Sequence, residues 1–145
     1  MTDDDGLSAV YNQELIRLSS QASMPRHLDD PDSVARAVSP ICGSEVTVEL
    51  KISGSVVTDF GFEVEACALT KTAVAVMADA IRGKSRDDIK QAGDDMRAML
   101  NGDGDGPVGD WADLRILLPV KDYKARHNAM MLPFEAVEKA FARLS

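Results

Sequence analysis

The chain has 145 residues, enough for one domain with one core, and its 45% hydrophobic and 28% charged residues are ordinary for a soluble globular protein. Its 24 acidic and 16 basic residues give a net charge of −8, which disfavours nucleic acid and anionic membranes as partners because both bind clustered Lys and Arg. No stretch approaches the ~20 apolar residues of a transmembrane helix, and the acidic start is unlike a signal peptide. We therefore expect a cytoplasmic protein with a single domain over residues 1–145, of which residues 1–6 form a disordered tail.

The first half of the chain changes from helical to strand periodicity. Apolar residues at helical spacing predict an amphipathic helix over residues 7–20, and the proline-containing residues 21–41 are predicted to be irregular. Two runs that alternate apolar and polar residues follow on either side of Ser53-Gly54-Ser55, which predicts an antiparallel hairpin with one buried face. The apolar positions of these runs are Val46, Val48, Leu50, Ile52, Phe60, Phe62, Val64 and Ala66.

The second half has helical patterns throughout. The pattern predicts a helix that follows Cys67 and ends near Gly83, and a helix over residues 86–100 with Ser85 as its N-cap. A Gly- and Asp-rich loop over residues 101–110 leads to a short helix that ends near Pro119. The last predicted helix covers residues 133–144, with Pro133 in its first turn. Together these elements predict an α+β fold, a short antiparallel sheet of about three strands with helices packed on one face.

The two cysteines of the chain, Cys42 and Cys67, lie at the two ends of the predicted hairpin, which brings its ends together. Cys67 precedes a helix, and a helix N-terminus favours the thiolate that binds metal or attacks sulfur. In a chain of cytosolic character such cysteines are free thiols, metal ligands or redox groups more often than a structural disulfide. We therefore expect a shared site, although each cysteine alone is also compatible with a small buried core residue.

His127 is the candidate third member of this site because imidazole binds zinc and iron and also acts as a base. An ordinary surface histidine is the alternative for His127, and it is the interpretation we prefer for His27. The loop that begins at Asn101 resembles the start of a calcium loop, but Ala112 stands where the twelfth-position Glu is needed. We interpret that loop as acidic and solvated.

The contexts of both cysteines resemble one protein family. Pro40-Ile41-Cys42-Gly43-Ser44 resembles the Pro-x-Cys-Gly-Asp motif of the U-type iron–sulfur cluster assembly scaffolds, the group of NifU N-terminal domains, IscU and SufU. The segment from Cys67 to Gly83-Lys84-Ser85 resembles the family's second cysteine and the helix after it. The tail over residues 123–139 resembles the family's closing segment, and residues 101–120 look most like an insertion of the SufU branch. The resemblance covers residues 7–144 and implies a SufE/NifU-like fold.

By this alignment the family's third cysteine is replaced by Ala129 and its motif aspartate by Ser44. The resemblance implies a scaffold or carrier rather than a catalyst. It would bind iron or a transient Fe–S cluster through Cys42 and Cys67, with His127 as a further metal ligand, and pass it to Fe–S acceptor proteins. A cysteine desulfurase is the implied partner. The alternatives are a zinc-binding sulfur acceptor that stimulates a cysteine desulfurase, and a divergent interaction module that has lost the metal.

Overall fold

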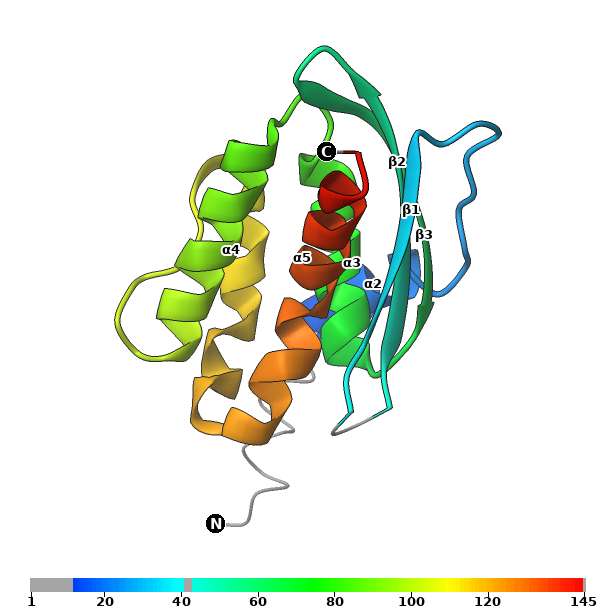
Figure 1. Ribbon diagram of the computed structural model, residues 1–145. Helices are drawn as coiled ribbons and strands as arrows, with labels where there is room; N and C mark the ends of the chain where they lie inside the picture. The colour runs from blue at the N-terminus through cyan, green and yellow to red at the C-terminus, as the bar shows by residue number, and fades with distance from the viewer. Residues whose placement is uncertain (1–11, 41–42, 145) are drawn as a thin grey trace.

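A computed structural model describes residues 12–40 and 43–144. Three antiparallel strands form one sheet in the order β1 (Ser33–Val38), β2 (Glu45–Ser53) and β3 (Val56–Glu65). Helices α3 (Ala68–Ala80) and α5 (His127–Ala142) pack on one face of this sheet, as Figure 1 shows. The predicted α+β fold with helices on one face of a three-stranded sheet is therefore confirmed.

The remaining helices form the outer parts of the molecule. Helix α2 (Gln13–Gln21) packs against α3, and α4 (Arg86–Leu100) packs against α5. The 3-10 segments η1 (Gly109–Asp122) and η2 (Lys124–Arg126) lead from α4 to α5. Within the described part of the chain, none of the helices has both the length and the apolar content needed to cross a bilayer.

The β2–β3 hairpin has the predicted turn and the predicted buried face. Gly54 takes a positive φ of 64° in the turn, a conformation that glycine adopts without strain. Val46, Val48 and Leu50 are completely buried, because their side chains point toward the helices. A register shift at Lys51/Ile52 bends the hairpin before its turn. Hairpin formation brings Glu45 and Glu65 opposite each other, so residues 43–44 and the start of α3 lie at the same end of the sheet.

Helices α3 and α4 follow the predicted boundaries. Cys67 is the N-cap of α3, which is buried on most of its circumference because the sheet, α2, α5 and η1 surround it. Helix α4 begins after Ser85, whose hydroxyl accepts from the Asp88 N–H while the Asp88 carboxylate accepts from the Ser85 N–H. This reciprocal capping box satisfies two backbone donors that have no partner inside the helix.

The prediction that residues 21–41 are irregular is wrong, because β1 lies within them. Its buried positions are Ser33, Ala35 and Ala37, whereas Val34 and Val38 are exposed. The strand therefore has an alternating burial pattern with small residues on the inside, which gives a weak hydrophobic signal.

The predicted start of the last helix is also wrong. Helix α5 begins at His127, and Pro133 lies inside it rather than in its first turn. The short predicted helix that ends near Pro119 is in fact η1, which continues through Pro119 to Asp122. The predicted helix over residues 7–20 is confirmed from Gln13 onward but is wrong at Asn12, which has an extended backbone and caps α2 by accepting from the Leu15 N–H. Residues 7–11 lie outside the described part of the chain.

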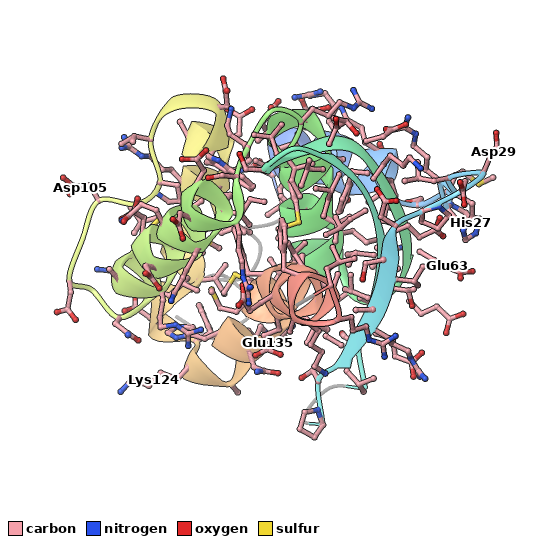
Figure 2. All side chains as sticks on the ribbon, turned by 45° about the horizontal axis from the view of Figure 1, so that its top comes forward. His27, Asp29, Glu63, Asp105, Lys124 and Glu135 are labelled. Atoms are coloured by element: carbon pink, nitrogen blue, oxygen red, sulfur yellow. The ribbon has the colours of Figure 1, made fainter. Side chains whose placement is uncertain are left out.

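Residues 24–32, here called the strap, cross the outer face of the sheet. The backbone of Arg26 exchanges two hydrogen bonds with Phe62 of β3, at 2.9 and 2.7 Å. Gly61 makes this approach possible, because a Cβ atom there would lie 2.7 Å from the Arg26 carbonyl oxygen. The Leu28 N–H donates to the Glu49 carboxylate at 2.8 Å, so the strap also covers the middle of β2. Figure 2 shows His27, Asp29 and Glu63 on this side of the sheet, away from the helices.

Candidate functional site

Cys67 lies where β3 ends and α3 begins. Its backbone is extended (φ −70°, ψ 169°), as an N-cap residue requires, and its carbonyl accepts from the Lys71 N–H at 3.1 Å. The residue is half-buried and its thiol is not in a disulfide. The side chain therefore lies at the positive end of the α3 dipole, which favours bound negative charge.

A hollow of 370 Å³, here called the Cys67 hollow, opens beside this thiol. Three parts of the chain line it: the connection before β2, the junction of β3 with α3, and η2 together with the start of α5. Its lining residues are Gly43, Ser44, Glu65, Ala66, Cys67, Ala125, Arg126 and Ala129. Figure 1 shows that the starts of α3 and α5 lie at the same end of the molecule as the end of β1 and the start of β2. The small side chains leave room beside the sulfur, and Arg126 supplies a positive charge.

Two hydrogen-bonding contacts connect Cys67 to the start of α5. The Cys67 Sγ lies 3.6 Å from the Thr70 Oγ1, and the Thr70 hydroxyl donates to the Ala129 carbonyl at 3.0 Å. Thr70 is completely buried and Ala129 nearly so. Sequence reasoning missed Thr70. Its position three residues after Cys67, on the same side of the helix, was the available signal.

The structure brings together some of the residues singled out in the sequence. Cys67 lines the hollow, and so do Ser44 and Ala129, which align with the motif aspartate and the third cysteine of the family. Cys42 lies outside the described residues.

His127 begins α5, and its imidazole is directed elsewhere. Its Nε2 atom donates to the Lys121 carbonyl at 2.7 Å, and the residue lines two neighbouring hollows that also contain Lys124. It is not among the residues that line the Cys67 hollow. The role of His127 as a metal ligand therefore stays a prediction.

The donor atoms around the hollow are one soft sulfur and several hard oxygens. Cys67 supplies the thiol, whereas Ser44 and Glu65 supply a hydroxyl and a carboxylate. Among residues 12–40 and 43–144, no three His, Cys, Asp or Glu residues are grouped closely enough to hold a metal ion. A thiolate is the preferred protein ligand of iron–sulfur clusters, and zinc also binds it. The Cys67 side of the hollow thus fits a thiophilic metal. A complete coordination shell would need ligands in addition to those that residues 12–40 and 43–144 bring together here.

His27 lies on the strap and takes no part in the hollow. Its side chain is 55% exposed, and its Nδ1 lies 2.6 Å from the buried Glu49 carboxylate. The hydrogen bond to Glu49 raises the pKa of His27 above its ordinary value. The expected surface position is thus correct, but the histidine has a carboxylate partner that lies far from it in the sequence.

Comparison with known proteins gives a consistent result. The model of the NifU-like N terminal domain family matches residues 11–130. Over 136 residues the chain is 22% identical to the iron–sulfur cluster assembly scaffold protein IscU of Thermotoga maritima, covering 94% of this chain and 95% of the relative. Over 104 residues it is 28% identical to the zinc-dependent sulfurtransferase SufU of Bacillus subtilis, covering 72% and 71% of the two chains.

Solved structures agree with these sequence matches. The crystal structure of a nitrogen-fixing NifU-like protein (N-terminal) from Brucella abortus superposes with a TM-score of 0.88 at 39% identity, and 94% of this chain and 95% of that chain are covered. A putative iron–sulfur cluster assembly scaffold protein for the SUF system from Fervidobacterium islandicum has the same fold. Its TM-score is 0.81 at 22% identity, with 90% and 96% of the two chains covered.

Proposed function

Because the chain belongs to the NifU-like N terminal domain family, we propose that it is an iron–sulfur cluster assembly scaffold or carrier that uses Cys42 and Cys67. These two thiolates bind iron or a transient Fe–S cluster as cargo, which then passes to acceptor proteins. The observation that supports the proposal is the Cys67 hollow. Cys67 lines it, and so does Gly43, the residue bonded to Cys42.

The chemistry of the hollow suits a negatively charged, sulfur-containing cargo. Thiolates are soft ligands for iron and sulfide. The N-terminus of α3 and the guanidinium of Arg126 both favour negative charge next to Cys67. The small side chains of Ala125 and Ala129 leave space on the α5 side for a ligand from a partner protein.

In this proposal the cargo arrives and leaves through partner proteins. A cysteine desulfurase supplies the sulfur, and Fe–S acceptor proteins receive the cluster. His127 is the candidate additional ligand from this chain. To reach the cargo, its imidazole has to leave the Lys121 carbonyl and turn toward Cys67.

A second function is favoured by the similarity to SufU, which is named a zinc-dependent sulfurtransferase. In that case zinc is held at the Cys67 hollow and the chain accepts sulfur from a cysteine desulfurase. The thiolate of the acceptor cysteine attacks the outer sulfur of the desulfurase persulfide, a new S–S bond forms, and the desulfurase cysteine leaves as a thiolate.

Anaerobic purification followed by measurement of iron, zinc and acid-labile sulfide tests both functions. We expect iron with sulfide in the wild-type protein, and loss of both in Cys42→Ala and Cys67→Ala. His127→Ala should weaken binding, since a lost ligand costs more than the roughly 10–100-fold typical of an outer-shell partner. His27→Ala is the matched control, because that histidine lies on the strap and does not line the Cys67 hollow.

The outcomes separate the proposals. Zinc without sulfide supports the sulfur-acceptor function. Unchanged metal content in His127→Ala shows that His127 is no ligand. A protein that binds neither iron nor zinc after reconstitution contradicts both functions. The remaining interpretation is then a divergent interaction module that has lost the metal.

A further inference from the structure

We propose that Thr70 is a positioning residue for Cys67, which holds the sulfur at the Cys67 hollow and connects it to α5. The inference rests on the proposed function, because it concerns the thiol assigned there to the cargo. It is carried by the contacts between Cys67, Thr70 and Ala129, and by the proline inside α5.

The hydroxyl of Thr70 has one proton, and its direction is set by α5. The side chain is completely buried, so its hydroxyl needs a partner inside the protein, and it donates to the Ala129 carbonyl at 3.0 Å. With its proton used there, the Thr70 oxygen is left as an acceptor toward the Cys67 thiol at 3.6 Å. The sulfur is thus held by an oxygen whose own orientation is fixed.

The carbonyl of Ala129 is available because of Pro133. In an α-helix a carbonyl accepts from the N–H four residues later, and for Ala129 that residue is Pro133, which has no N–H. A buried carbonyl without a partner is costly, so an outside donor stabilises this turn of α5. Thr70 is that donor. The proline therefore directs the Thr70 hydroxyl to α5 and at the same time fixes the oxygen beside Cys67.

Thr72 provides a matched control in the same helix. It is also completely buried, but its hydroxyl lies within hydrogen-bonding distance of the Ala68 carbonyl at 2.8 Å and the Leu15 carbonyl at 3.3 Å. Within residues 12–40 and 43–144, the Cys67 thiol has its hydrogen-bonding contact with Thr70 and none with Thr72, so Thr72→Val removes a buried hydroxyl that does not contact the sulfur.

The first experiment measures the S–H stretching band of Cys67 by Raman spectroscopy in metal-free protein that carries Cys42→Ala, at a pH at which the thiol is protonated. The Thr70 oxygen can accept only from a protonated thiol, so the band reports this contact directly. We expect Thr70→Val to shift the band to higher frequency, because the loss of an S–H···O hydrogen bond strengthens the S–H bond. Thr70→Ser should restore the wild-type band, and Thr72→Val should leave it unchanged.

The second experiment separates positioning of Cys67 from support of α5. In Thr70→Val the Ala129 carbonyl loses its donor, so urea unfolding should show reduced stability. The double variant Thr70→Val with Pro133→Ala gains an N–H at position 133 that can donate to Ala129, and it should recover part of that stability. The S–H band of Cys67 should nevertheless stay at the higher frequency, because the acceptor next to the sulfur is still missing.

Two results overturn the proposal. One is an S–H band in Thr70→Val at the same frequency as in Thr72→Val. The other is a double variant in which the stability and the S–H band both return to wild type, since Thr70 then acts only through α5. The Raman measurement requires no bound metal, so a wild-type protein without iron or zinc would contradict the proposed function and leave this test intact.

Discussion

At the scale of single residues, the site depends on which side chains face the Cys67 hollow. Cys67 and Ala129 line it from two different helices, α3 and α5. The family resemblance places a cysteine at position 129, and the structure places that position beside the thiol of Cys67. Alanine there leaves the hollow open on the α5 side, so in the proposed metal site this position determines whether a third thiolate is available.

Ala129→Cys should therefore strengthen metal binding. A third thiolate brings the site closer to the four ligands that zinc prefers, and we expect zinc affinity to rise by roughly tenfold or more. Competition with a chromophoric chelator measures the affinity. Ala125→Cys is the matched control, because it adds a thiol to the same hollow from η2. Equal gains in the two variants would show that any added thiol suffices and that position 129 has no special geometry.

At the scale of elements, the strap connects α2 to β1 and carries an ion pair over the sheet. Glu49 is buried beneath it and accepts from the Leu28 N–H and from the His27 imidazole. The hydrogen bond to Glu49 raises the pKa of His27, with Glu63 adding a smaller attraction. Protonation of His27 thus strengthens the attachment of the strap to the sheet.

The strap should make folding stability depend on pH. Since the folded pKa of His27 lies above its ordinary value of 6.5, its contribution is complete below about pH 6.5 and is lost as the pH rises through the folded pKa. Urea unfolding of wild type and His27→Gln over that range should show a stability difference that is largest at low pH and then disappears.

His127→Gln is the control for this measurement, because that imidazole donates to a backbone carbonyl instead of a carboxylate. A difference between wild type and His27→Gln that stays constant with pH would contradict the role of the His27–Glu49 pair.

At the scale of the whole molecule, one continuous core joins the sheet to the described α-helices and to η1. Buried residues of β2, α3, α4, η1 and α5 belong to the same cluster. Trp111 of η1 contacts Phe134 of α5, with ring centroids 5.7 Å apart, although η1 lies far from the sheet. This continuity is the structural basis for expecting a single domain.

Unfolding should accordingly be one cooperative transition. Trp111 is the single tryptophan of the chain, so its fluorescence reports η1, whereas far-UV circular dichroism reports all helices and strands. The two urea curves should coincide, as they do for most domains of under about 150 residues. A fluorescence transition at lower urea would show that η1 and the helices around it unfold separately from the sheet.

The sequence alone determined the elements whose signals are local. Alternation over Val46 to Ile52 and a glycine turn specified the hairpin, and Ser85 as an N-cap residue specified the start of α4, because the residues responsible are neighbours along the chain. The same reasoning located Cys67 at the start of a helix, and the family resemblance indicated positions 44 and 129 as its neighbours.

Only the tertiary structure decided the features that depend on partners distant in sequence. Strand β1 was missed because its buried residues, Ser33, Ala35 and Ala37, are small and give a weak hydrophobic pattern. They are buried because β1 pairs with β2 and α5 packs against it. Pro133 is accommodated inside α5, where it leaves the Ala129 carbonyl without its usual helical donor. Thr70, on another helix, donates to that carbonyl instead. The same contact orients the oxygen beside Cys67. A sequence shows which groups lack a local partner, but the partner that satisfies them is determined by the packing of the whole chain.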